Sequence, residues 1–204
     1  MDKEYQGINY SWLGRAMEYY ADIGYSPFEA KWMVDSYISM QTNPSEHGAF
    51  IVTNGNGHYK HLVGSAEQSF MEEVWKGKMK PQKLYVSCSP CFRRGDTFGS
   101  RHQETFMKVE LSYYSYDPND LTYLWTLIED AENFFINELG MKTVKREKDY
   151  DRGYDDLFAN DKEIDDLYIE IGSYGMRELI DGKGRTYYSH YGTGLALPRA
   201  QFAL

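Results

Sequence analysis

The chain has 204 residues, of which 42% are hydrophobic and 26% charged, a composition typical of one soluble globular domain spanning residues 1–204. No apolar run approaches the roughly 20 residues that cross a bilayer. The N-terminus also lacks the basic and apolar stretches of a signal peptide, so we expect a cytoplasmic protein without a membrane partner. The net charge of −9 argues against autonomous nucleic-acid binding, because phosphate backbones bind clustered Lys and Arg.

The first predicted element is a helix. Apolar residues recur at helical spacing over 12–20, and Gly24 is a plausible stop. The mixed pattern from Phe28 to Met40 is interpreted as an extended segment.

A β-hairpin is predicted next. Residues 49–53 and 59–63 flank Asn54-Gly-Asn-Gly57, and Asn and Gly tolerate the positive φ that such turns need. A helix over 67–75 and strands over 83–93 and 105–116 follow.

The longest predicted helix begins at Asn119 or Asp120, a suitable N-cap, and runs to Leu139 before Gly140. Strands are predicted over 141–145, 167–171 and 176–180, the acidic stretch 149–166 is interpreted as a loop over a short strand, and Pro198 opens a short terminal helix. Strands joined by hairpins and interrupted by helices favour an antiparallel α+β domain over a doubly wound one.

The two cysteines, Cys88 and Cys91, exclude a disulfide framework. Their C-x-x-C spacing suits a redox pair or half of a zinc site, but there is no second pair, and Cys88 ends a strand-like run. Two ordinary thiols are the favoured interpretation.

A candidate nucleotide site lies across the strands at 83–93 and 105–116. Arg93 ends the first strand, and Phe106 and Glu110 share one face of the second because side chains alternate with period two. A guanidinium suits a phosphate, and an aromatic ring can stack on adenine. The alternative is a hairpin with surface charges and a core Phe.

This segment resembles the second signature motif of class II aminoacyl-tRNA synthetases, Phe-Arg-x-Glu, a loop, then Arg/His-x-x-x-Phe-x-x-x-Glu/Asp. His102, Phe106 and Glu110 match its second half, and the wording is similar to the seryl branch of class IIa. The resemblance implies that Arg93 holds the α-phosphate of ATP, Phe106 stacks on adenine, and Arg101 or His102 faces the outer phosphates.

The C-terminal stretch Tyr191-Gly-Thr-Gly-Leu-Ala-Leu-Pro198-Arg199 resembles the third signature motif, a Gly-rich strand leading into a helix, with Pro198 in place of the last Gly. The resemblance implies that Arg199 holds the γ-phosphate of a bent ATP. Its alternative is a Gly-rich turn before a helix.

Two further segments resemble family motifs in the expected order. The stretch from Leu62 to Glu67 is similar to the loop whose Glu receives the substrate amino group, which assigns Glu67, with Ser65 beside it, to the amino acid. The stretch Tyr168-Ile-Glu170-Ile-Gly-Ser173 is similar to the strand that supplies a magnesium ligand, and Glu170 and Ser173 carry the oxygen donors that Mg2+ prefers. The alternatives are a helix N-terminal acid for Glu67 and a structural role for Glu170.

The sequence departs from the family at two points. Lys31 stands where the first motif has its Pro at the dimer contact, so the homodimer that the resemblance implies lacks this residue. Gly95, followed by Asp96, stands where Phe-Arg-x-Glu has its Glu.

The resemblance implies ATP-dependent amino acid activation with Mg2+, in which a carboxylate attacks the α-phosphorus and pyrophosphate leaves. No segment resembles an anticodon-binding domain, so the acceptor of the aminoacyl group is expected to be a tRNA end or another acceptor such as a carrier protein. The amino acid cannot be read from the sequence. The alternative is a non-catalytic paralogue that senses an amino acid or nucleotide as a regulator or subunit.

Overall fold

The computed structural model describes residues 7–42, 48–53, 56–94, 99, 101–148, 154–160 and 167–204. The helices are α1 (Tyr10–Asp22), α2 (Ser36–Ser39), α3 (Ala66–Trp75), α4 (Thr122–Asn133), the π-helical turn η1 (Phe134–Glu138) and the 3-10 turn η2 (Arg199–Ala203). The strands are β1 (Ser26–Pro27), β2 (Met33–Asp35), β3 (Ile51–Thr53), β4 (Tyr59–Leu62), β5 (Leu84–Phe92), β6 (Thr105–Ser115), β7 (Val144–Lys148), β8 (Asp155–Asn160), β9 (Tyr168–Gly172), β10 (Tyr174–Ile180) and β11 (Thr186–Leu197). No helix in this described part of the chain is long and apolar enough to cross a membrane.

The central sheet has five strands in the order β1-β5-β6-β11-β10. All its neighbours are antiparallel except β1, which runs parallel to β5. Glu110 of β6 lies between Ser87 of β5 and Thr193 of β11. Because side chains alternate along each strand, Phe106, Lys108 and Glu110 share one face of the sheet.

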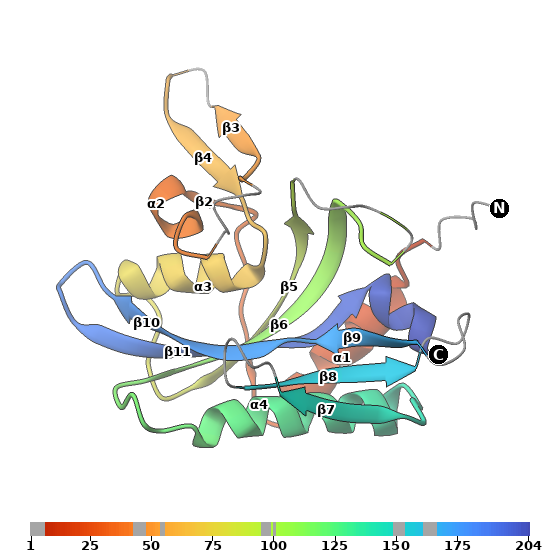
Figure 1. Cartoon of the computed structure of the whole chain (residues 1–204). Coiled ribbons are helices and arrows are strands. Elements are labelled where there is room, and N and C mark those ends of the chain that lie inside the picture. The colour runs from red at the N-terminus through yellow and green to blue at the C-terminus, as the bar shows by residue number, and fades with distance from the viewer. Residues whose placement is uncertain are drawn as a thin grey trace.

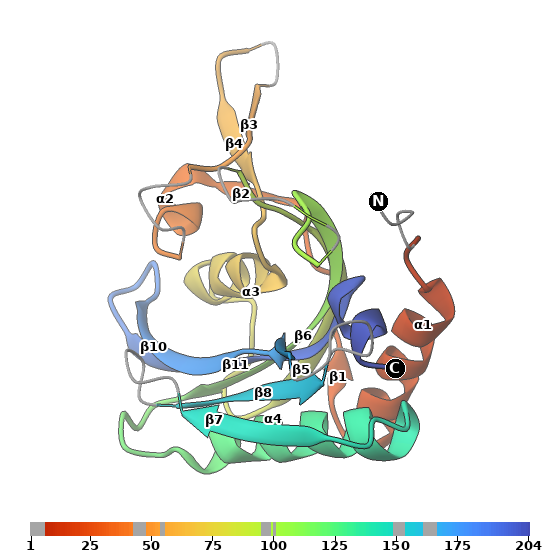
Figure 2. The ribbon, with the colours of Figure 1, turned by 45° about the vertical axis from the view of Figure 1, so that its right-hand side comes forward.

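Helices cover the two faces of this sheet differently (Figures 1 and 2). On one face, α1 and α4 pack on apolar side chains such as Val109, Leu111 and Leu195. On the other, α3 packs on a smaller cluster around Phe70 and Tyr114. The larger core therefore lies on one face of the sheet, and the α3 face carries the smaller apolar cluster together with polar side chains such as Lys108 and Glu110.

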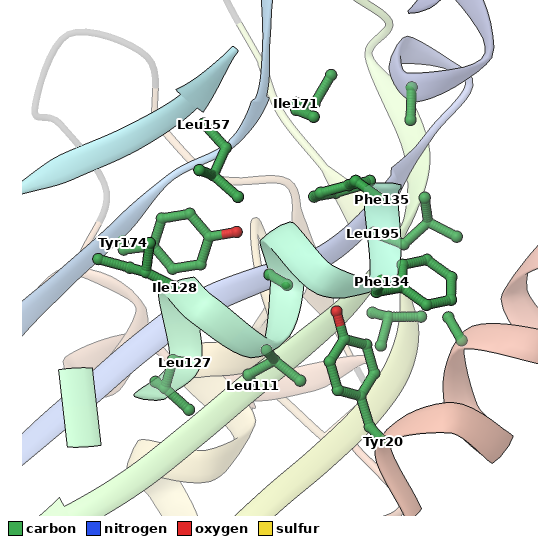
Figure 3. Close-up of a cluster of buried hydrophobic side chains, with 14 of the residues drawn as sticks. Tyr20, Leu111, Leu127, Ile128, Phe134, Phe135, Leu157, Ile171, Tyr174 and Leu195 are labelled. Carbon is green, nitrogen blue, oxygen red and sulfur yellow. The ribbon is translucent and has the colours of Figure 1, made fainter. Parts of the chain in front are cut away.

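Aliphatic side chains and aromatic rings together fill the larger core (Figure 3). The rings of Tyr20 and Phe134 lie 5.6 Å apart, and the Tyr20 hydroxyl donates to the Gly194 carbonyl at 3.0 Å. The Tyr174 hydroxyl donates to the Thr193 carbonyl at 2.8 Å. These two buried hydroxyls thus each have an acceptor, and both bonds tie the core to the backbone of β11.

A smaller three-stranded sheet, in the order β2-β4-β3, lies with α2 beside α3, and its β3–β4 hairpin projects from the body (Figure 1). Lys31 pairs with Glu72 and Glu73 of α3. Lys31, which occupies the position where the family motif has its Pro, therefore forms its ion pairs within its own chain.

A second three-stranded sheet, in the order β7-β8-β9, packs against α4 and β11. It brings Glu170 of β9 to the edge of the five-stranded sheet.

The structure confirms the α+β class, the β3–β4 hairpin, and the helices predicted over 12–20, 67–75 and 119–139. The last of these begins at Thr122 and ends in the turn η1, and its N-cap is Leu121, so the N-cap predicted at Asn119 or Asp120 is wrong. The extended interpretation of 28–40 is wrong in part, because residues 36–39 form α2. The strand predicted over 141–145 begins at Val144, since Gly140 adopts φ 75° and the chain turns before it extends. Within 149–166, β8 supplies the expected strand, while Asn54, Gly55, Gly95 and Asp96 lie outside the described residues.

Candidate functional site

A cleft of about 810 Å³ opens on the α3 side of the central sheet. All ten residues that the sequence singled out line it, and they are Ser65, Glu67, Arg93, Arg101, His102, Phe106, Glu110, Glu170, Ser173 and Arg199. The arrangement excludes the alternative in which Phe106 is a sealed core residue, because its half-buried ring reaches the cleft.

The outer wall of the cleft is formed where β5 ends beside β6. The Arg93 N–H donates to the Glu104 carbonyl at 2.8 Å, which extends the β5–β6 pairing by one residue. The Arg93 guanidinium lies 5.1 Å from the centre of the Phe106 ring. A flat cationic group and an aromatic face are therefore adjacent at this wall.

Arg199 directs its guanidinium across the outer end of the cleft. Its Nη1 donates to Glu170 Oε1 at 3.1 Å, and its Nη2 donates to His102 Nε2 at 2.7 Å. Because Arg has no acceptor, Nε2 of His102 must be unprotonated in this contact. Arg199 Nε also faces the Arg101 carbonyl at 3.4 Å, so the start of η2 joins β9 to the loop before β6.

The outer end of the cleft has an excess of positive charge. Four guanidinium groups, those of Arg93, Arg94, Arg101 and Arg199, line the cleft, and Glu170 is the carboxylate beside them. Such an end suits a ligand with several negative charges.

The floor of the cleft carries a buried ion pair. Lys108 Nζ lies 3.0 Å and 2.9 Å from the two carboxylate oxygens of Glu110, whose side chain has no exposed surface. Ser65 Oγ donates to Glu110 Oε2 and accepts from the Glu67 N–H at 3.3 Å. Ser65 is thus both the N-cap of α3 and the link between this helix and the sheet.

The inner end of the cleft carries a second ion pair. Arg177 Nε donates to Glu67 Oε1 at 2.7 Å, and the Arg177 guanidinium lies 5.2 Å from the centre of the Tyr191 ring. Burial raises the pKa of Glu67, and the neighbouring Arg177 charge opposes this shift. The inner end therefore holds equal numbers of acidic and basic side chains, Glu67 and Glu110 against Arg177 and Lys108.

The donors proposed for magnesium, Glu170 and Ser173, both line the cleft. Among the described residues there is no group of three His, Cys, Asp or Glu side chains that could hold a metal ion. Magnesium is often bound by one or two protein carboxylates together with substrate phosphates and water. Glu170 and Ser173 fit an arrangement of this kind, in which substrate phosphates and water complete the coordination of the metal ion.

Sequence reasoning assigned no role to two cleft residues, Lys108 and Arg177. Arg177 is an isolated cation in a strand that also contains Met176, Leu179 and Ile180, and this was the signal that could have revealed it. Lys108 lies between Phe106 and Glu110 on the same face of β6, so period-two alternation already directs it to the site.

An antiparallel sheet backed by helices, with this cleft on its opposite face, is the fold of class II aminoacyl-tRNA synthetase catalytic domains. Solved structures with this fold include the cytoplasmic serine-tRNA ligase of Naegleria fowleri in complex with AMP, with a TM-score of 0.75 and 18% identity over 96% of this chain and 47% of that one. Seryl-tRNA synthetase of Pyrococcus horikoshii complexed with ATP gives a TM-score of 0.72 and 19% identity over 95% and 49% of the two chains.

Pyrrolysyl-tRNA synthetase of Desulfitobacterium hafniense is also similar, with a TM-score of 0.66 and 14% identity over 94% of this chain and 67% of that one. The present chain thus spans about half the length of the two seryl enzymes. No protein-family model and no curated protein sequence matches it. At these identities the comparisons establish the fold.

Proposed function

We propose that the cleft binds ATP and an amino acid and joins them as an aminoacyl adenylate, with release of pyrophosphate. The division of charge along the cleft supports this proposal most strongly. Its outer end is cationic, and its inner end is polar and balanced. A triphosphate, which is anionic, complements the cationic outer end, and a zwitterion, which has no net charge, complements the balanced inner end.

At the outer end, Arg93 and Arg199 would hold the α- and γ-phosphates and Phe106 would stack on adenine, with Arg101 and His102 near the outer phosphates. Support comes from the ring of Phe106, which reaches the cleft below the Arg93 guanidinium. Two solved structures with this fold contain AMP or ATP.

At the inner end, Glu67 would receive the substrate ammonium group. Glu67 Oε1 accepts from Arg177, while Oε2 has no hydrogen-bond partner among the described residues. An ammonium ion offers three donors and suits such an oxygen. Glu110 would act from below by holding Ser65 and the start of α3, since both its oxygens are already bonded.

The reaction needs no protein nucleophile. The substrate carboxylate attacks the α-phosphorus in line with the departing pyrophosphate, and the protein orients the reactants and neutralises developing charge. Glu170 and Ser173 would supply oxygens to Mg2+, which adds charge neutralisation when bound.

The later fate of the aminoacyl group is a separate part of the proposal. A tRNA end or a carrier protein would accept it, and a homodimer would be the working form. The exposed Trp32, Tyr37 and Met40 near α2 are apolar surface consistent with a protein contact.

Amino-acid-dependent pyrophosphate exchange, measured with each amino acid in turn, tests the proposal. We expect Arg93→Ala to reduce this exchange by about 100-fold, because removal of one preorganised charge commonly costs about 3 kcal/mol in the transition state. Arg15→Ala is the matched control, since Arg15 pairs with Glu138 on the outer surface. Wild-type exchange in Arg93→Ala would reject its role.

Calorimetry with ATP, Mg2+ and amino acids separates this enzyme from a sensor. Binding of both ligands without exchange would favour the regulatory alternative. If neither ATP nor any amino acid binds, both the enzymatic proposal and the regulatory alternative are rejected.

A further inference from the structure

The inner end of the cleft contains an arrangement that the proposed chemistry does not by itself require. Arg177 projects from β10, bonds the carboxylate of Glu67 on α3 and the carbonyl of Gln41 after α2, and also lies against Tyr191 of β11. Gln41 is followed by Thr42, which lines the cleft. One guanidinium therefore connects the acid of the inner end to the chain segment that bounds it.

The wall segment, residues 39–42, is held from a second side by Gln68. Its amide nitrogen donates to Thr42 Oγ1 at 2.6 Å and faces the Ser39 carbonyl at 3.4 Å. Among the described residues, the Gln68 side chain makes no hydrogen bond to the Glu67 carboxylate. The wall thus has two anchors, and only Arg177 also contacts the acid.

The positive charge of Arg177 compensates for the poor solvation of the buried Glu67 carboxylate. Glu67 is 5% exposed, so its ionised form is poorly solvated. The ionisable groups that face it are Arg177 from β10, Lys108, Glu110 and Tyr114 from β6, and Tyr191 from β11. Lys108 is already paired with Glu110, so Arg177 is the cation directly bonded to Glu67.

We infer that Arg177 is a positioning residue that holds the Glu67 carboxylate as an anion facing the cleft and fastens it to the wall segment. Within the proposed function, on which this reading of the ligand rests, the site takes an amino acid with a free, protonated α-amino group. Glu67 Oε1 stays with Arg177 and Oε2 meets the ammonium. An N-acylated amino acid has no such cation and would not bind.

The ionisation of Glu67 can be measured without any ligand. The carboxyl carbon of Glu67, labelled with 13C and assigned through Glu67→Gln, is titrated by NMR in wild type, Arg177→Met and Arg177→Lys. We expect the midpoint to rise by at least about 1 pH unit in Arg177→Met, because an opposite charge at this distance commonly shifts a carboxyl by about 1 to 3 units. Arg177→Lys should restore most of the difference.

Gln68→Met is the matched control. It releases the wall segment and the Gly64 N–H but leaves the bond between Arg177 and Glu67, so the Glu67 midpoint should stay at its wild-type value. An unchanged midpoint in Arg177→Met, with a wild-type circular dichroism spectrum, overturns the inference. An equal rise in Gln68→Met also overturns it, since the wall and not the charge would then control Glu67.

Amino acid binding supplies the second measurement. At a pH between the two measured Glu67 midpoints, calorimetry in buffers of different ionisation enthalpy should show more proton release on binding to Arg177→Met than to wild type, because Glu67 must ionise to receive the ammonium. A raised midpoint with no binding of any amino acid to wild type would retain the role of Arg177 and reject the proposed function. Equal proton release in both proteins would reject the role of Arg177.

Discussion

His190 of β11 is a buried imidazole outside the cleft. It has no exposed surface, and neither ring nitrogen has a hydrogen-bond partner in the part of the chain that the structure describes. Burial lowers the pKa of His190, and Asp120 opposes this shift. The folded protein therefore keeps the ring neutral, whereas the unfolded chain binds a proton below about pH 6.5.

We expect His190 to make the protein less stable as the pH falls from 7 to 5, since the unfolded state binds the additional proton. His190→Phe should flatten that part of the pH dependence, measured as the free energy of unfolding in urea at both pH values. Tyr113→Phe keeps the imidazole beside its edge-on ring partner, 5.7 Å away, and should retain the wild-type dependence. Parallel curves for wild type and His190→Phe would contradict this account.

The position of the ten candidate site residues along one cleft was predictable, because they lie in short patterns with strong chemistry. Phe106 and Glu110 are placed by alternation on one strand, and the structure puts both at the cleft. The contact between Arg177 and Glu67 was not predictable, because it joins residues 110 positions apart in the sequence. Such pairings are decided by tertiary packing and leave no local spacing to read.

At the scale of elements, Glu72 joins α3 to the small sheet. Its side chain has no exposed surface, and it meets Lys31 at 3.1 Å and Lys76 at 2.7 Å. The Asp35 N–H donates to its other oxygen at 3.0 Å. Burial alone would raise the pKa of Glu72, but the bonds from Lys76, the Asp35 backbone and Lys31 lower it to about 2.

Because this pKa is depressed in the folded state, Glu72 contributes stability above about pH 4.5, and that contribution is lost as the pH falls toward 2. Glu72→Gln should cost about 2 kcal/mol at pH 7, the usual scale for hydrogen bonds to a charged group. The difference in the free energy of unfolding between wild type and Glu72→Gln should become smaller below about pH 4.5, as measured by urea unfolding. Glu129→Gln, at an exposed site on α4, should cost little, and a gap that persists at low pH would contradict the prediction.

Close packing between β10 and β11 depends on Gly192. The Tyr174 ring covers this residue so closely that a Cβ there would overlap its edge. We expect Gly192→Ala to destabilise the protein by about 1 to 3 kcal/mol, as overpacked cores do, in thermal unfolding. Adding Tyr174→Leu should give less than the sum of the two single effects. Gly14→Ala on α1, where a Cβ meets nothing within 4 Å, should be tolerated.

Elements were predictable where a pattern repeats over several turns or strands. Leu124, Ile128 and Ala131, which recur at helical spacing, are buried in α4 as that pattern predicts, whereas Trp125 of the same pattern is exposed and the buried Leu127 lies outside it. Helix α2 has four residues, too few for such a pattern, and was missed. The parallel β1–β5 pair spans two residues on each strand and joins segments far apart in sequence, so no local signal marks it.

At the scale of the whole molecule, the cleft separates two electrostatic environments. We expect the Kd for ATP to rise steeply between 0.05 and 0.5 M salt, while the Kd for the amino acid changes little, because screening acts on the uncompensated outer charge more than on paired inner charges. Calorimetric titrations across this range check the prediction. Equal salt dependence for both ligands would contradict the proposed division of the cleft.

The contact between Arg199 and Glu170 also joins two sheets, since Glu170 belongs to β9 and Arg199 directly follows the end of β11. An anion that approaches Arg199 must compete with a carboxylate already in place. A lone sulfate or monophosphate exchanges one partner for another and gains little. Within the proposed function, a polyphosphate that also reaches Arg93 and Arg101 would gain additional contacts, so we expect the resting ion pair to favour longer phosphate chains over single phosphates.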